Sequence, residues 1–179
     1  MTSQSILSFW FEEIDARQWW AKSDDFDRLI IQRFGVLHAA AARCELSHWR
    51  DTPQGRLAEV IVLDQFSRNM YRDQPQSFAC DPLALALAQH AVSLQADLAL
   101  PPEQRAFLYM PYMHSESPLI HANALSLFSQ KGLEHALPSE IRHKAIVDRF
   151  GRYPHRNTIL GRPSSAEEIE FLTTPGSSF

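Results

Sequence analysis

Apolar residues recur at three- and four-residue steps through most of the chain, which is the period of an amphipathic α-helix. The run from Phe26 to Ala41 is the clearest case, with Ile30 and Phe34 on one side of the predicted helix. No stretch shows the strict alternation of a half-buried strand, and the apolar run at residues 60–63 lies inside a helical period. The pattern therefore predicts an all-α protein.

Capping residues and prolines indicate where the predicted helices begin. Thr52-Pro53, Asp81-Pro82 and Pro101-Pro102 each place a proline in the first helical turn, where its missing N–H is not needed. With the other capping signals they predict about eight helices, which begin near Ser5, Asp24, Thr52, Asp81, Pro101, Pro118, Pro138 and Ser165. The connections are short, which favours antiparallel helical hairpins. We expect one domain over residues 1–172 and a flexible tail over residues 173–179.

Three residues interrupt the helical pattern. Pro111 lacks the backbone donor that a helix interior uses, so the helix from Pro101 should kink or end there. Gly35, in the middle of a long helix, suggests that another helix approaches closely. Arg149 falls on the apolar side of the helix that ends at Phe150, so it should need a buried partner.

The predicted helix at residues 60–72 carries an unusual polar side. At 100° per residue, this side holds Asp64, Gln65, Arg68, Asn69 and Arg72. Solvated helix faces usually carry Lys and Glu, whereas these side chains have planar, directional hydrogen-bonding groups. Asp64 and Arg68 stand four residues apart, so the simplest explanation is a surface ion pair worth roughly 0.3–0.5 kcal/mol.

Two further stretches are rich in similar residues. One covers residues 109–117, and the other covers residues 148–163, where four arginines and a histidine share a loop with glycine and proline. Such crowded polar segments beside apolar helices indicate a polar site. We predict that the three stretches converge, with Arg68, His114 and Arg152 in one pocket.

Charge and cysteine content exclude several classes of protein. The net charge is −4, whereas a protein that binds nucleic acid or an acidic membrane usually carries excess positive charge. Cys44 and Cys80 are too few for a disulfide scaffold. No window approaches the ~20 apolar residues that span a bilayer, and the N-terminus lacks the basic start of a signal peptide. We therefore expect a soluble, cytoplasmic protein.

The three stretches together resemble the signatures of a largely bacterial family, domain-of-unknown-function family 924. The residues that carry the resemblance are Leu63–Asn69, Met110–Glu116 and Arg149–Asn157, and the similarity extends from Phe9 to Leu172. The resemblance implies a helical fold like that of tetratricopeptide-repeat proteins, an α-α superhelix, although no repeat of fixed period is legible here. It implies no particular activity.

The leading hypothesis is a pocket rich in arginine and histidine that binds a small anionic metabolite. Its predicted ligand-binding residues are Asp64, Arg68, Asn69, Arg72, Arg149, Arg152, Arg156 and Asn157. In an enzymatic version, His114 or His155 acts as general acid or base, with Glu116 or Asp64 orienting the imidazole. No motif of a known reaction class accompanies these residues.

The same residues also fit a protein that binds no small molecule. A helical scaffold could bind a peptide or protein in an exposed groove, or the polar residues could form a buried network that only holds helices in register. His121 is interpreted as a core histidine with satisfied hydrogen bonds. His114, Glu116, His121 and His155 have side chains that can bind a metal, but the nearby arginines would repel a divalent cation. We expect no metal and no cofactor, and the oligomeric state stays open.

Overall fold

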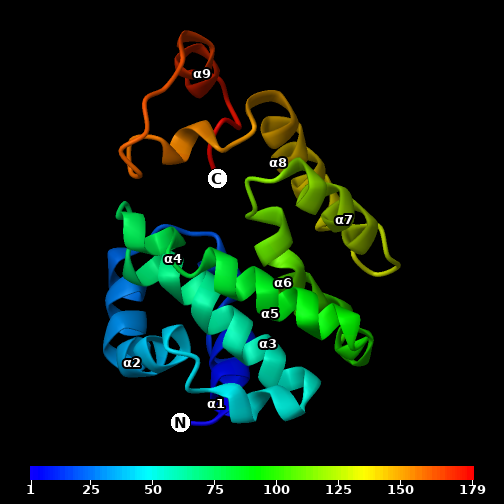
Figure 1. Cartoon of the computed structure of the whole chain (residues 1–179). Helices are drawn as coiled ribbons and strands as arrows, with labels where there is room; N and C mark the ends of the chain where they lie inside the picture. The colour runs from blue at the N-terminus through cyan, green and yellow to red at the C-terminus, as the bar shows by residue number, and fades with distance from the viewer.

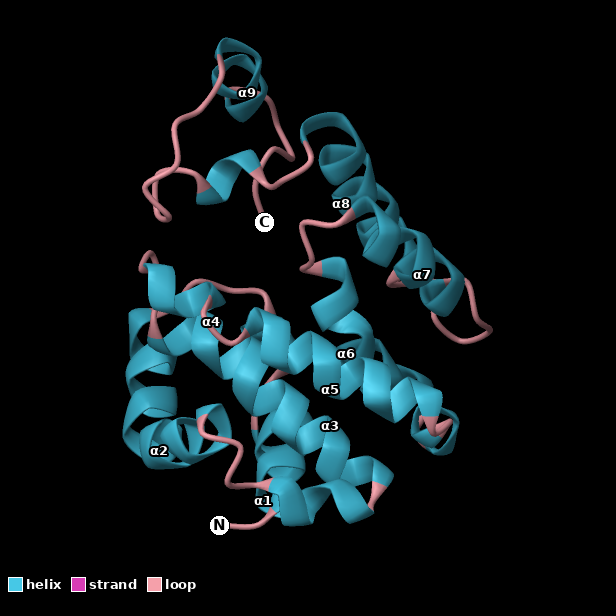
Figure 2. Ribbon diagram, in the orientation of Figure 1, coloured by secondary structure: helices cyan, strands magenta, loops and turns pink.

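A computed structural model describes residues 1–179, and it consists of helices and connecting segments without strands (Figures 1 and 2). The all-α prediction is therefore confirmed. The α-helices are α1 (Ser3–Ser8), α2 (Asp24–Ala42), α3 (Pro53–Ile61), α4 (Ser67–Met70), α5 (Asp81–Ser93), α6 (Pro102–Met113), α7 (Pro118–Phe128), α8 (Leu137–Phe150) and α9 (Ala166–Leu172). A π-helical segment, Val62–Phe66, joins α3 to α4 without a break, so the chain forms eight continuous helices.

Two helix starts match the capping signals residue for residue. The Thr52 hydroxyl accepts a hydrogen bond from the Gly55 N–H at the start of α3. Ser165 and Glu168 form a capping box at the start of α9. These short-range signals work because a cap satisfies backbone donors only three residues away.

Three other starts are displaced from their predicted positions. The cap of α1 is Thr2, and the predicted cap Ser5 instead completes the capping box from the third helical position. Asp24 and Asp81 are the first residues of α2 and α5, so each cap lies one residue earlier. Because Asp81 does not cap a helix, its carboxylate is available to other partners.

The continuous helix formed by α3 and α4 is the centre of the molecule. It packs against α1, α2, α5 and α6 (Figure 1). Every residue from 57 to 67 is buried, including Glu59, Asp64 and Gln65. The explanation of Asp64 and Arg68 as a surface ion pair is therefore wrong, because this helix is surrounded by other helices and has no solvated side.

The later helices lie beside one another in chain order. α6 packs against α5 and α7, and α7 packs against α8, as the green to yellow part of Figure 1 shows. A main core of 33 buried residues extends from α1 to the segment after α7. A small second cluster of Ile146, Val147 and Tyr153 packs with Phe150 and Phe171 under the C-terminal segment. None of the helices combines the length and the apolar composition that crossing a bilayer requires.

Two local predictions, those for Gly35 and Arg149, are wrong, and α6 does not end at Pro111. Pro111 lies inside α6, which continues to Met113; one N–H is lost, but the His114 N–H donates to the Met110 carbonyl at 2.9 Å. No atom lies within 4 Å of a Cβ built on Gly35, so no helix approaches there. The Arg149 side chain is 52% exposed and pairs with Glu167, because the side of α8 that faces the protein is centred on other residues.

The C-terminal residues contact the helical domain in this structure. Ser177 is buried and its hydroxyl donates to the Leu172 carbonyl at 3.2 Å. The ring of Phe179 lies 3.6 Å from the ring of His143, measured between centroids. The flexibility expected of residues 173–179 stays a prediction.

Gly35 and Gly55 should respond in opposite ways to alanine. A Cβ at Gly55 would lie 1.9 Å from the Trp49 carbonyl oxygen, a clash with backbone. We expect Gly55→Ala to lower the free energy of unfolding by about 1–3 kcal/mol or more. Gly35→Ala should raise it by about 0.5–1 kcal/mol, because alanine loses less backbone entropy in an open helical position. Urea unfolding of both variants measures this, and a Gly55→Ala protein as stable as wild type would contradict the packing around α3.

Candidate functional site

A cavity of about 390 Å³ lies where α5, the end of α6 and the loop after α8 meet. Three predicted site residues line it: His114, Glu116 and Arg156. Most of the wall is apolar, since seven of the 12 lining residues are Pro75, Phe78, Ala79, Pro82, Leu85, Pro111 and Leu160. Residues of the stretches 109–117 and 148–163 thus line the cavity directly. The helix at residues 60–72 contributes indirectly, because its Asp64 contacts His114.

Asp64 supports His114 from behind the cavity. The Asp64 side chain is 1% exposed, and its Oδ1 lies 2.8 Å from His114 Nδ1. Gln65 donates to the other carboxylate oxygen at 2.6 Å. Burial would raise the pKa of the Asp64 carboxyl, but the charges of Arg68 and His114 together hold this pKa below its usual range. The ionised carboxylate can only accept, so Nδ1 carries the imidazole proton.

Burial and the charge of Arg68 lower the pKa of His114, and Asp64 only partly opposes them. The imidazole is therefore neutral near pH 7. With the proton on Nδ1, the lone pair of His114 is on Nε2. This nitrogen has no hydrogen-bond partner in the protein, and it is not fully buried. It is therefore accessible from the cavity, which His114 lines.

Arg68 and Asp81 link the central helix to α5. Arg68 donates to both carboxylate oxygens of Asp81 at 3.0 and 3.1 Å, and it also lies 3.2 Å from Asp64 Oδ1. Asp81 lines the cavity, whereas Arg68 lies behind it. Arg68 is therefore a fully paired cation rather than a free anion-binding group.

Arg156 differs from every other arginine at the site. The residue is 6% exposed, and its guanidinium lies between the rings of Phe78 and Tyr153, 4.5 and 4.6 Å from their centroids. Its nearest carboxylate is Asp81 at 3.5 Å, and no hydrogen bond to a protein acceptor is formed. Burial lowers the pKa of Arg156, and the neighbouring Arg68 lowers it further. This cation is under-satisfied, although its stacking on two aromatic rings stabilises it.

Glu116 is occupied by structural contacts. It accepts two hydrogen bonds from Arg162, at 2.6 and 2.9 Å, and one from the Tyr153 backbone N–H at 2.7 Å. Burial would raise the pKa of Glu116, but these donors lower it. A carboxylate so engaged cannot readily take a proton, so Glu116 positions the loop after α8.

The structure places the remaining predicted residues away from the cavity. Asn69 and Arg72 both bind Asp27 on α2. Arg149 pairs with Glu167, and Arg152 pairs with Glu168 at 2.6 Å. Asn157 is fully buried, where it binds Ser164 and Arg162. Each of these groups already has a partner: α2 and α9 supply acids to Asn69 and the arginines, and Asn157 binds residues of its own loop.

The other histidines of the region lie beside aromatic rings, with His155 half-buried and His121 buried. His155 stacks near Tyr153 and Phe179, and its Nδ1 has no hydrogen-bond partner. His121 is fully buried, with Nδ1 2.8 Å from Glu140 and Nε2 2.8 Å from the Ser115 carbonyl. The interpretation of His121 as a satisfied core histidine is confirmed.

Sequence reasoning missed Asp81, Phe78 and Tyr153 as parts of the site. Asp81 was interpreted as a helix cap because Asp-Pro is a common start signal, although the same residue can pair with arginine. Tyr153 lies within the arginine-rich stretch, but its role depends on the Arg156 side chain folding back over its ring. Only the tertiary fold brings Phe78 into contact with the same guanidinium.

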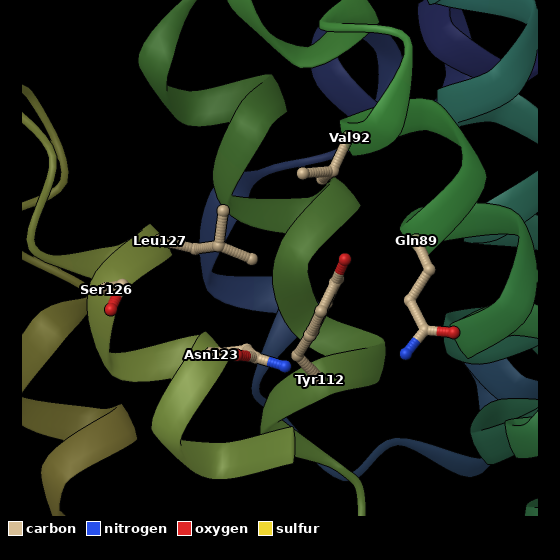
Figure 3. A pocket seen from close by; sticks show the side chains of 6 residues that line it. All are labelled: Gln89, Val92, Tyr112, Asn123, Ser126 and Leu127. Carbon is tan, nitrogen blue, oxygen red and sulfur yellow. The ribbon is translucent and has the colours of Figure 1, made fainter. Parts of the chain in front are cut away.

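A second hollow of about 330 Å³ lies between α5 and α7, over α6. Figure 3 shows its six lining residues: Gln89, Val92, Tyr112, Asn123, Ser126 and Leu127. The side chains of Gln89, Tyr112 and Asn123 form no hydrogen bond within the protein. None of the residues predicted for the site lies here.

These features define an all-α protein with a cavity between its helical core and its C-terminal loop. The cavity wall is largely apolar but includes a group of charged and polar side chains. The family model of bacterial proteins of unknown function DUF924 matches residues 6–176, and the chain belongs to this family. A solved structure from Agrobacterium tumefaciens, the protein of unknown function ATU0120, is 36% identical with a TM-score of 0.90. The match covers 95% of this chain and 96% of that one. A comparison with curated proteins gives no match.

His143 and His155 should make the fold sensitive to acid. Burial lowers the pKa of His143 to about 3 and, with Arg156, that of His155 to about 4. In the unfolded chain both titrate near 6.5. Below about pH 6.5 the unfolded chain therefore binds protons that the folded protein does not, so the free energy of unfolding should fall as pH falls toward 4.

A His143→Phe variant tests whether His143 contributes to this acid sensitivity. The ring keeps contact with Phe179 but cannot titrate, so the loss of stability between about pH 7 and about pH 5 should be smaller by up to roughly 1.4 kcal/mol per pH unit. Urea unfolding at both pH values measures the difference. The exposed His135→Gln variant is the control. Equal pH dependence in His143→Phe and wild type would assign the acid sensitivity to other groups.

Proposed function

We propose that this protein binds a small anionic molecule in the cavity lined by Arg156 and His114. The observation that carries the proposal is the state of Arg156, a guanidinium that is 6% exposed and has no hydrogen-bond acceptor in the protein. Its only charged contact is the 3.5 Å ion pair with Asp81, and buried charges are normally hydrogen-bonded as well, because an unsatisfied buried charge costs several kcal/mol. A bound anion would supply the missing acceptors.

The charges around the cavity favour a carboxylate over a phosphate dianion as the group that contacts Arg156. Three guanidinium groups, on Arg68, Arg156 and Arg162, face three carboxylates, on Asp64, Asp81 and Glu116. A carboxylate at Arg156 adds one negative charge to this balance, whereas a phosphate dianion adds two. The apolar walls suit a ligand with a hydrocarbon body behind the carboxylate.

The ligand set is therefore smaller than the sequence suggests. Arg156 is the proposed anion contact, and Asp64, Arg68 and Asp81 are proposed to hold its surroundings. Asn69, Arg72, Arg149, Arg152 and Asn157 are proposed to stabilise the fold through the partners described above. We also propose a cytoplasmic location and no nucleic-acid partner, in keeping with the net charge of −4.

A peptide- or protein-binding scaffold is the second candidate. The observation that favours it is the hollow of Figure 3, where Gln89 and Asn123 carry amides without partners in the protein. Such amides can hydrogen-bond the backbone of an extended peptide. This candidate predicts that substitutions at Arg156 leave binding unchanged.

Arg156→Gln should weaken anion binding without unfolding the protein. We expect glutarate to raise the melting temperature of the wild type and to bind the variant roughly 10-fold to 100-fold more weakly, as loss of a charged hydrogen bond implies. Calorimetric titration with glutarate, hexanoate and inorganic phosphate measures the affinities. Arg149→Gln, which removes an exposed arginine, is the matched control.

The stability of the Arg156→Gln variant distinguishes a ligand-binding role of Arg156 from a purely structural one. If the ion pair with Asp81 and the two ring contacts of Arg156 hold the helices together, Arg156→Gln should lower the free energy of unfolding by about 3–5 kcal/mol. A ligand site predicts a change of about 1 kcal/mol or less in the ligand-free protein, because Asp81 keeps both hydrogen bonds from Arg68. A large loss, with no anion stabilising the wild type, would refute the proposal.

A further inference from the structure

His114 is set apart from the other buried histidines by its two different environments. His121 uses both ring nitrogens in contacts within the core, and His143 donates to the Ser139 carbonyl at 2.7 Å. His38 contacts the Ser67 hydroxyl at 2.7 Å. Only His114 has a buried carboxylate on one nitrogen and a cavity on the other.

The carboxylate behind His114 is held firmly. Asp64 lies in the π-helical segment Val62–Phe66, a type of turn that occurs often at functional sites. Contacts from Gln65 and Arg68 fix its oxygens, so the Nδ1–H of His114 has one well-defined acceptor. An imidazole oriented in this way presents a basic Nε2 in a fixed direction.

We propose that the cavity is a hydrolytic active site, in which His114 activates a water molecule against an acyl ester that also carries a carboxylate. The inference rests on the proposed anion site, because Arg156 would hold the carboxylate while the ester carbonyl lies near His114. Both residues line the same cavity of about 390 Å³, which has room for a small dicarboxylate monoester. Asp64 is a positioning residue that acts through His114.

The reaction needs only the substrate and water. His114 Nε2 accepts a proton from water as the water oxygen bonds to the carbonyl carbon and the carbonyl electron pair moves to oxygen. When the tetrahedral intermediate collapses, the bond from carbon to the leaving oxygen breaks, and that oxygen takes the proton from Nε2. The products are a dicarboxylic acid and an alcohol, and His114 returns to its neutral form.

The Ser115 hydroxyl is placed to assist. Ser115 follows His114 and lines the cavity, and its oxygen accepts the Ser117 N–H at 3.2 Å. Its own proton is not donated to any protein group, so it can be donated to the developing oxyanion.

The test uses mono-p-nitrophenyl glutarate, which joins a free carboxylate to an activated ester. Release of nitrophenol by the wild type should exceed that by His114→Gln about 100-fold or more, the usual contribution of a general base. His135→Gln, which changes an exposed histidine, should match the wild type. Binding of glutarate itself should survive in His114→Gln, which shows that the variant is folded.

The pH profile of the wild type provides a second readout that does not depend on folding of a variant. The rate should rise on a single limb with a midpoint below 6.5, as His114 loses its proton, and level off near neutral pH. In Asp64→Asn the midpoint should move to lower pH and the plateau should fall, because the carboxylate that favours the imidazolium and fixes the tautomer is gone. A rate in His114→Gln within about three-fold of wild type would overturn the proposal, since general-base catalysis contributes far more.

Failure of the two proposals can be told apart. If glutarate binds but the ester is not hydrolysed above the buffer rate, His114 is not a general base and the anion site stands. If p-nitrophenyl acetate, which lacks the carboxylate, is cleaved as well as the glutarate ester and glutarate does not bind, the anion site fails. If neither compound binds or reacts, both proposals are wrong.

Discussion

A buried chain of opposite charges joins the helices that form the cavity. Asp64 in the central helix contacts Arg68, and Arg68 is paired with Asp81 at the start of α5. His114 at the end of α6 and Arg156 in the C-terminal loop contact the two carboxylates of this chain. Because an unpaired buried charge costs several kcal/mol, these pairs fix how the helices meet. The orientation of His114 and Asp81 in the cavity depends on them.

Tyr153 connects this chain of charges to the C-terminal half of the molecule. Its hydroxyl donates to the Met113 carbonyl at 2.5 Å and lies 3.0 Å from His121 Nε2, while its ring supports the Arg156 guanidinium. His121 is in turn paired with Glu140 on α8. The guanidinium of Arg156 thus packs on a tyrosine that is anchored on α6 and α7, which holds the proposed anion contact in place.

The unsatisfied atoms of the structure concentrate in the same region. Five buried side-chain atoms lack a hydrogen-bond partner, and three of them belong to Glu140, His155 and Arg156. Burial raises the pKa of Glu140, although His121 opposes the shift. Native proteins leave few such groups, and those that remain often mark functional sites. The tight core around α3 and α4 stabilises the fold that keeps these groups in place.

The sequence by itself determined the helical class, several helix starts and the stretches that reach the cavity. These follow from local rules, because a helical period and a cap such as Thr52 involve residues within about one turn of each other. Which side chains pair across the fold does not follow from these local rules. Arg149 faces solvent and Arg156 is buried, although both lie in one arginine-rich stretch. The tertiary structure alone decided this, since the partner of a side chain depends on which segment packs opposite it. In the central helix, the π-helical segment Val62–Phe66 also changes the direction in which side chains such as Asp64 point, which the regular helical period does not predict.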